Sequence, residues 1–409
     1  MTTVVLVGTL DTKRDEHTWL RERLHAAGVE TRLIDVGTFS DGGGIADIGS
    51  DEVAAAAGTD VETLRGADDR GAAIAAMSEG AAAVVSRLYS AGELHAVLAI
   101  GGSGGSSVAS RAMQALPVGV PKLLVTTMAA GDVSPYVGAT DVTIMPSVVD
   151  VAGINRISRE VLSNAVAAAA AMARGFEERA AAERSDEAHL IGATMFGLTT
   201  PAVDEARARL SELGYEVLVF HATGAGGRAM ETLVRDGFLD GVLDLTTTEL
   251  VDDLLGGVLS AGPDRLQAAG AAGLPQVVSV GALDMCNFGP EATVPERYAG
   301  RSFVVHNPTV TLMRTTAEEM AELGTRIATR LRAASGPVEV HLPLRGVSGI
   351  DVEGGPFHDP EADAACFAAI RAGLAGSDVA VREVDLAVND PGFGTGAADA
   401  LHELIRSAR

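Results

Sequence analysis

The stretch VLAIGGSGGSSVASRAM, residues 97–113, passes from an apolar run through a glycine- and serine-rich turn into an alanine-rich segment. A short apolar run bounded by glycines predicts a buried strand, and the segment after it predicts a helix. The same succession recurs along the chain. This alternation is typical of βαβ units, so it predicts mostly parallel sheets covered by helices.

The predicted strands fall into two series separated by a helix-forming and then charged segment at 164–187. The first series comprises residues 3–8, 31–37, 96–102, 122–128 and 141–147, with helices over 15–27, 68–90 and 105–115. The second comprises residues 189–195, 215–221, 241–246, 275–282, 338–344 and 379–387. We therefore predict two doubly wound (Rossmann-like) α/β domains, residues 1–186 and 187–409.

A weak internal sequence similarity, called here the internal echo, accompanies the start of the second series of strands. LHAAGVETRLID at 24–35 aligns with LSELGYEVLVFH at 210–221, and both end in the second strand of their series. Two readings stay open, because a gene duplication and a generic junction from helix through glycine to strand would both produce it.

Composition excludes several classes of protein. The net charge is −24 and aromatic residues make up 4% of the 409 residues, so no basic surface with stacking rings is available for nucleic acid. No run approaches the ~20 apolar residues of a membrane span, and the first residues do not resemble a signal peptide. Cys286 and Cys366 lie far apart, which disfavours a disulfide or a thiolate metal site. We expect a cytoplasmic protein.

The glycine-rich turn is the first candidate site. At the carboxyl edge of a parallel sheet, the amides that open a helix attract anions, and glycines let a phosphate approach closely. The sequence has neither the GK[ST] ending of a P-loop nor a GxGxxG fingerprint, so a helix start packed tightly on its strand is an equal alternative. The candidate phosphate-binding residues are Gly102, Ser103, Gly104, Gly105 and Ser106.

Two neighbouring strand ends add polar groups. Thr9, Asp11 and Lys13 follow the first strand, and Lys13 is one of only two lysines in the chain. Lys13 would meet a phosphate and Asp11 a ribose hydroxyl or a metal, although a helix cap beside a solvated lysine explains the same residues. After the fourth strand, Thr127, Gly131 and Asp132 are candidates for contacts to a base or sugar.

The second domain offers a candidate catalytic set. The segment HATGAGGR, residues 221–228, predicts a second anion site, and other polar strand-end residues include Arg265 and His306. If these loops converge, His221 would be the general base, with Asp284 and Arg314 acting on an anionic metabolite. Helix caps and scaffold hydrogen bonds are the alternative for each residue. No spacing supports a dedicated metal site.

Taken together, several motifs resemble a poorly characterised ATP-binding family that includes the tomato mosaic virus resistance protein, a nucleotide-binding inhibitor of viral RNA replication. The motifs that carry the resemblance are VGTLDTKRDE, IGGSGGSS, TTMAAGDVSPYVGATD, VFHATGAGGRAMETLVRDG, GALDMCNFGP and HNPTVTLMRTT. The resemblance spans nearly the whole chain. It implies two α/β domains, ATP held by the first, and a homodimer.

The resulting functional hypothesis is a protein that binds ATP, with accompanying Mg²⁺, through its first domain and acts on a small anionic metabolite at the interdomain cleft. The alternative is a non-catalytic nucleotide-dependent sensor or interaction protein.

Overall fold

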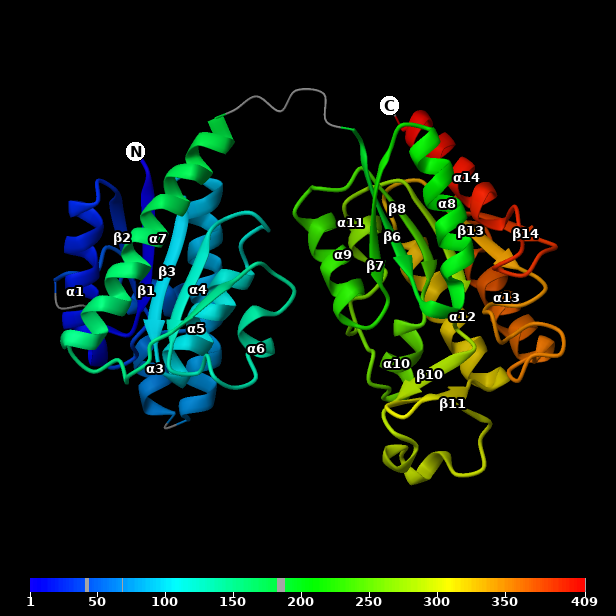
Figure 1. Ribbon diagram of the computed structural model, residues 1–409, viewed down its shortest axis with the longest axis horizontal. Coiled ribbons are helices and arrows are strands. Elements are labelled where there is room, and N and C mark those ends of the chain that lie inside the picture. The colour runs from blue at the N-terminus through cyan, green and yellow to red at the C-terminus, as the bar shows by residue number, and fades with distance from the viewer. Residues whose placement is uncertain (41–43, 68, 182–187, 409) are drawn as a thin grey trace. The chain divides into compact units, whose positions relative to one another are not determined.

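Five apolar runs in the first half of the chain form one parallel sheet (Figure 1). The computed structural model describes residues 1–40, 44–67, 69–181 and 188–408, which fall into two units, Met1–Ser185 and Asp186–Arg409. The predicted boundary at residue 186 lies outside the described residues. The first unit contains β1 (Thr3–Gly8), α1 (Leu10–Ala26), β2 (Glu30–Asp35), α2 (Ser50–Ala56), α3 (Val61–Gly66), α4 (Arg70–Ser90), β3 (Ala96–Gly101), α5 (Ser103–Gln114), β4 (Lys122–Thr126), α6 (Ser134–Val137), β5 (Thr143–Pro146) and α7 (Arg156–Ala181).

The strand order of this sheet is β2-β1-β3-β4-β5. Leucines of α1 and α7 pack on one face of the sheet, whereas α2, α4 and α5 pack on the other. The direction in which successive strands are added to the sheet therefore reverses between β1 and β3, while all five strands stay parallel. Ligands of doubly wound sheets bind outside the carboxyl ends of the strands at such a switch point.

The second unit contains a six-stranded parallel sheet of order β14-β13-β9-β8-β6-β7. Its elements are β6 (Leu190–Met195), α8 (Thr200–Glu212), β7 (Glu216–His221), α9 (Ala225–Arg235), β8 (Gly241–Thr246), α10 (Glu249–Leu255), α11 (Ala268–Ala271), β9 (Gln276–Gly281), β10 (Met285–Phe288), β11 (Phe303–Asn307), β12 (Val310–Arg314), α12 (Ala317–Arg332), β13 (Val338–Pro343), α13 (Pro360–Leu374), β14 (Ala380–Val384) and α14 (Phe393–Ser407). The predicted fold class, two doubly wound α/β domains, is confirmed.

The two sheets share their winding. In the second unit, α8 and α14 cover one face, and α9 to α13 cover the other. In both units the first and last helices lie on the same face of the sheet. In both units the first strand also lies between the second and the third, in the orders β2-β1-β3 and β7-β6-β8. The aligned segments 24–35 and 210–221 end in equivalent strands, β2 and β7, so the echo extends from sequence to topology.

An antiparallel sheet of order β10-β12-β11 follows β9 and was not predicted (Figure 1). From the sequence, Asp284, His306 and Arg314 were expected to lie on loops at strand ends. The strands there are only four or five residues long, and a short apolar run is a weak periodic signal. β12 is nevertheless almost fully buried, because it is the central strand of the three.

Helix composition bears on the membrane question. None of the helices in the described ranges combines the length and the apolar character needed to cross a bilayer.

Lys122, at the start of β4, is fully buried. Its ammonium donates to the carbonyl oxygens of Pro117 and Val120 at 2.7 and 2.9 Å and to Asp141 Oδ1 at 2.6 Å. A buried ammonium needs this number of acceptors to offset its lost hydration. Lys122 therefore fixes the loop before β4 and takes no part in a surface site.

Gly8, the last residue of β1, allows α1 to approach the sheet. A Cβ atom there would overlap the imidazole of His17, which is fully buried. His17 Nδ1 donates to the Lys13 carbonyl oxygen at 2.8 Å, and burial lowers the pKa of His17. The ring is thus a neutral wedge between α1 and β1.

We expect Gly8→Ala to lower the free energy of unfolding of the first unit by about 2 kcal/mol, because the buried ring has no space to move into. Gly66→Ala is the matched control, since open space surrounds that helical glycine and a small gain in stability is expected. Urea unfolding of both variants is the measurement. Equal midpoints would contradict the wedge.

Candidate functional site

The turn after β1 is tied to the end of β2. Asp35 Oδ1 accepts from the backbone N–H groups of Leu10 at 3.1 Å and Gly37 at 2.9 Å. Asp11 packs against Gly37, and its Oδ2 accepts from the Phe39 N–H at 3.3 Å. The Thr9 hydroxyl lies 2.9 Å from that of Thr12. Asp35 and Asp11 therefore shape this edge of the sheet.

Lys13 lies where α1 is kinked. Its backbone, with φ −136°, departs from helical geometry. Its ammonium donates to the Val151 carbonyl oxygen at 2.5 Å. The positive charge of Lys13, which follows β1 in sequence, therefore lies against the segment that follows β5.

The glycine-rich turn opens α5 directly after β3. Gly102 is the N-cap and has no side chain to cap the helix, so the first-turn amides face the switch point. A Cβ on Gly101 would lie 3.3 Å from Gly105, so these two glycines also serve tight packing of helix on strand. The packing interpretation therefore applies to Gly101 and Gly105, and phosphate binding at this turn stays a prediction.

The serines of this turn also differ in availability. Ser103 is exposed, whereas Ser106 is buried and its hydroxyl lies 2.7 Å from the Thr126 hydroxyl. Ser106 thus links α5 to the end of β4.

A pocket of about 450 Å³ lies beside this turn. Its lining residues lie at and after the ends of β4 and β5, and they are Thr126, Thr127, Ala129, Ala130, Pro146, Ser147, Val148, Val149 and Asp150. Thr127 Oγ1 would lie 3.7 Å from a Cβ on Gly102, and the Thr127 N–H donates to the Gly101 carbonyl oxygen at 3.2 Å. Lys13 reaches Val151, next in sequence to the lining residue Asp150. Thr127 and Lys13 thus connect the pocket to the other two strand ends.

Of the other predicted contacts after β4, neither Gly131 nor Asp132 lines this pocket. Asp132 is exposed and its Oδ1 accepts from the Ser134 N–H at 2.9 Å. Hydrogen bonds from Ser134 lower the pKa of Asp132. Its carboxylate therefore supports the start of α6.

Arg70 was not predicted from the sequence as a site residue, yet it lies near the glycine-rich turn. It opens α4, and its Nη2 atom would lie 3.6 Å from a Cβ on Gly104. The neighbouring N-cap, Asp69, is engaged with the Ala72 N–H at 3.0 Å. No hydrogen bond or ion pair involves the Arg70 guanidinium within the ranges that the structure describes. Sequence offered no signal, because 34 positions separate Arg70 from Gly104.

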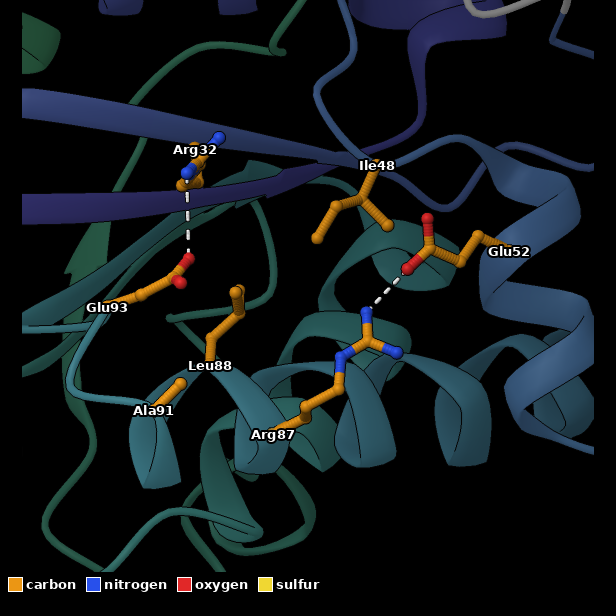
Figure 2. Close-up of a pocket in the computed structure, with 7 residues that line it drawn as sticks. All are labelled: Arg32, Ile48, Glu52, Arg87, Leu88, Ala91 and Glu93. Carbon is orange, nitrogen blue, oxygen red and sulfur yellow. Dashed lines mark hydrogen bonds and ion pairs between the residues drawn. The ribbon is translucent and has the colours of Figure 1, made fainter.

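A second pocket, of about 330 Å³, differs in its electrostatics (Figure 2). Figure 2 shows Arg87 pointing to Glu52 and Arg32 to Glu93, and the N–O distances are 2.5 and 3.5 Å. Each arginine thus faces a carboxylate. The paired charges leave little net field for an anionic ligand.

In the second unit, the predicted anion site is occupied by the chain itself. Glu249 Oε1 accepts from the N–H groups of Gly224 at 2.6 Å and Gly227 at 3.0 Å. A Cβ on Gly227 would overlap this carboxylate. The HATGAGG segment does bind an anion, but the anion is a buried side chain of α10.

Arg265 compensates this buried charge. Its guanidinium is fully buried, donates to both oxygens of Asp244 at 2.5 and 2.7 Å, and donates to Glu249 Oε2 at 2.7 Å. Glu231 Oε1 lies 3.3 Å away and also accepts from the Leu266 N–H. Arg265 thus holds three carboxylates and cannot serve a ligand.

Asp284 and Arg314 belong to a second buried cluster. Arg314 Nη2 donates to Asp363 Oδ1 at 2.9 Å and lies 3.6 Å from Asp351 Oδ1, while Asp284 Oδ2 accepts from the Ser348 hydroxyl at 2.8 Å. Burial, with the charge of Asp351, raises the pKa of Asp284 to about 7 and that of Asp363 to about 8. One arginine cannot neutralise three buried carboxylates, so protons remain on the cluster.

The histidines do not join this cluster. His221 is exposed at the end of β7 and stacks on Phe196 with ring centroids 5.7 Å apart. β6 and β8 separate β7 from β9, a lateral distance of about 14 Å. His306 is exposed on β11. Among the described residues, His221 makes no hydrogen bond or ion pair with Asp284 or Arg314, and a catalytic role for the three residues stays a prediction.

Comparisons with known proteins match both units. The N-terminal domain of the Uncharacterised protein family (UPF0261) matches residues 2–178, and its C-terminal domain matches residues 188–405. The chain belongs to this family. A UPF0261 protein of Clostridium tetani is 47% identical over 98% of this chain and 98% of its own.

A plant relative matches over part of its length. The ToMV resistance protein Tm-1 of Solanum lycopersicum is 40% identical over 99% of this chain and 56% of its own. The family relationship to the tomato protein that the motifs indicated is thereby confirmed, and ATP binding stays a prediction. A solved structure of a UDP-N-acetylglucosamine 2-epimerase described as putative, from Listeria monocytogenes, covers 68% of this chain and 78% of its own at a TM-score of 0.22 and 12% identity.

The carboxylate cluster predicts how stability of this UPF0261 protein depends on pH. Because the folded-state pKa values of Asp284 and Asp363 lie above the ordinary value of 3.8, the folded protein binds more protons between about pH 4 and pH 8. Stability therefore falls as pH rises through that window. Asp363→Asn should reduce the fall by on the order of 2 kcal/mol.

Urea midpoints at pH 5, 6, 7 and 8 measure this effect. The exposed Asp378→Asn is the control and should follow the wild-type profile. An unchanged slope in Asp363→Asn would show that the cluster holds no extra proton.

Arg265→Met should lower the free energy of unfolding by about 3–5 kcal/mol, because three buried carboxylates lose their counter-charge. The exposed pair of Arg345 with Asp385 provides the control, and Arg345→Met should leave the melting temperature nearly unchanged. Calorimetric melting of both variants tests this, and similar melting temperatures would refute the assigned role.

Proposed function

We propose that the first unit of this UPF0261 protein binds ATP, accompanied by Mg²⁺, with its phosphates on the glycine-rich turn. The observation that carries the proposal is the arrangement at one switch point of the first-turn amides of α5, the Arg70 guanidinium near Gly104 and a 450 Å³ pocket whose Thr127 lies near Gly102. Lys13 contacts the segment next to that pocket, and within the described residues the Arg70 guanidinium has no hydrogen-bond or ion-pair partner. Helix amides and cations of this kind recognise phosphate. The pocket volume falls in the range of ligand sites, about 300–1,000 Å³.

Observations in the second unit favour the alternative function, a nucleotide-dependent sensor without catalysis. An enzyme acting on an anionic metabolite was expected to use the HATGAGG segment and His221. That segment holds Glu249, and His221 lies apart from Asp284 and Arg314. We therefore propose ATP binding as the main function of the protein, with no metabolite bound at the HATGAGG segment. The homodimer implied by the family resemblance stays a prediction.

Calorimetric titration of MgATP into the folded protein tests the proposal. We expect wild type to bind, Arg70→Ala to bind about tenfold more weakly and Lys13→Ala to lose most binding, because a charge-assisted hydrogen bond contributes about 1.5–3 kcal/mol. Gly104→Val should also lose most binding, because its branched side chain would keep the phosphates from the amides that open α5.

Arg111→Ala is the matched control. It removes one positive charge from the far end of α5, where Arg111 pairs with Glu79 at 2.8 and 2.9 Å. Its affinity should equal that of wild type. The absence of binding in folded wild type would refute the ATP proposal.

A further inference from the structure

We propose that the pocket after β4 and β5 binds the nucleoside end of the ligand, with Val148 against the base and Asp150 accepting from the ribose hydroxyls. This inference rests on the proposed function and adds the direction in which the nucleotide lies. It assigns no phosphate contact to the pocket.

Val148 is the most unusual residue at this edge. It has φ +66° and is 75% exposed, whereas β-branched residues rarely adopt the left-handed region. Two hydrogen bonds within its turn fix this conformation, from the Val149 N–H to the Ser147 carbonyl oxygen and from the Ser147 hydroxyl to the Val149 carbonyl oxygen, both 2.7 Å. The strained turn is thus held in place with an apolar side chain lining the pocket.

The strain points to a ligand rather than to packing. Glycine or asparagine would satisfy the backbone here at lower cost, and an exposed valine contributes nothing to the core. Met128, from the segment after β4, is 38% exposed, and its N–H donates to the Thr126 hydroxyl at 3.0 Å. Met128 does not line the pocket, but its sequence neighbours Thr127 and Ala129 do, and the exposed apolar side chain of Val148 suits the face of a planar base.

Asp150 gives the pocket its polarity. Its exposed carboxylate lines the pocket and has no donor to its side chain within the described part of the chain. A carboxylate accepts from ribose hydroxyls and repels phosphates. Of the two cations assigned to phosphate, Arg70 lies at Gly104, whereas Lys13 donates to the Val151 carbonyl oxygen, next in sequence to Asp150. The phosphates therefore lie toward the glycine-rich turn, past Thr127, and the nucleoside lies toward Val148.

The test compares ATP, inorganic tripolyphosphate and adenosine by calorimetric titration into wild type, Val148→Gly and Asp150→Asn. We expect Val148→Gly to melt at a higher temperature, because the strain is relieved, and to bind ATP about tenfold more weakly. Asp150→Asn should also lower the affinity for ATP. Tripolyphosphate affinity should stay at the wild-type value in Val148→Gly and not fall in Asp150→Asn.

The exposed Val258, which has no positive φ, provides the control. Val258→Gly should not raise the melting temperature and should leave ATP affinity unchanged. A variant that is more stable yet binds ATP less well cannot owe the loss to misfolding.

The outcomes separate the two proposals. If Gly104→Val abolishes ATP and tripolyphosphate binding while Val148→Gly and Asp150→Asn bind ATP as wild type does, ATP binding stands and the nucleoside site is overturned. Equal weakening of ATP and tripolyphosphate in the two pocket variants also overturns it. If wild type binds neither ATP nor tripolyphosphate, the proposed function fails, and the adenosine titration decides the fate of the nucleoside site. Adenosine binding that is lost in Val148→Gly supports that site, and the absence of adenosine binding to wild type overturns it.

Discussion

Burial of both faces of a parallel sheet is the constraint from which the rest of this structure follows. β3 and β8 are buried along their whole length, and helices cover each sheet on both sides. No side chain in the middle of such a strand can reach a ligand. Polar chemistry is therefore confined to strand ends, and the reversal of winding beside β1 and β6 opens a crevice at one point in each unit.

The two units meet this constraint differently although their sheets are wound alike. The third strand of the first unit ends in glycines, and that of the second ends in three threonines and Glu249. At the end of the second strand, Asp35 in one unit corresponds to His221 in the other. In the second unit the chain's own carboxylates and Arg265 fill the crevice, whereas in the first a pocket remains beside the glycines.

The sequence predicted both parallel sheets because apolar runs alternate with helical segments of the expected length. It predicted which strand ends carry polar residues, since this depends only on order along the chain. It could not predict which of those residues meet. Glu249 and Gly224 are separated by 25 positions, and Arg314 meets Asp363 across 49, so neither pairing leaves a local pattern. The left-handed turn at Val148 was missed because β-branched residues rarely adopt a positive φ, so the sequence there argues against such a turn.

The scarcity of lysine has a chemical consequence. Of the two lysine side chains, that of Lys122 is fully buried with its ammonium hydrogen-bonded, and that of Lys13 is partly accessible where α1 meets the segment after β5. An acylating reagent that modifies ε-amines in the folded protein therefore has essentially one lysine to find. The extent of acylation reports directly on whether the Lys13 ammonium is in contact with solvent or engaged.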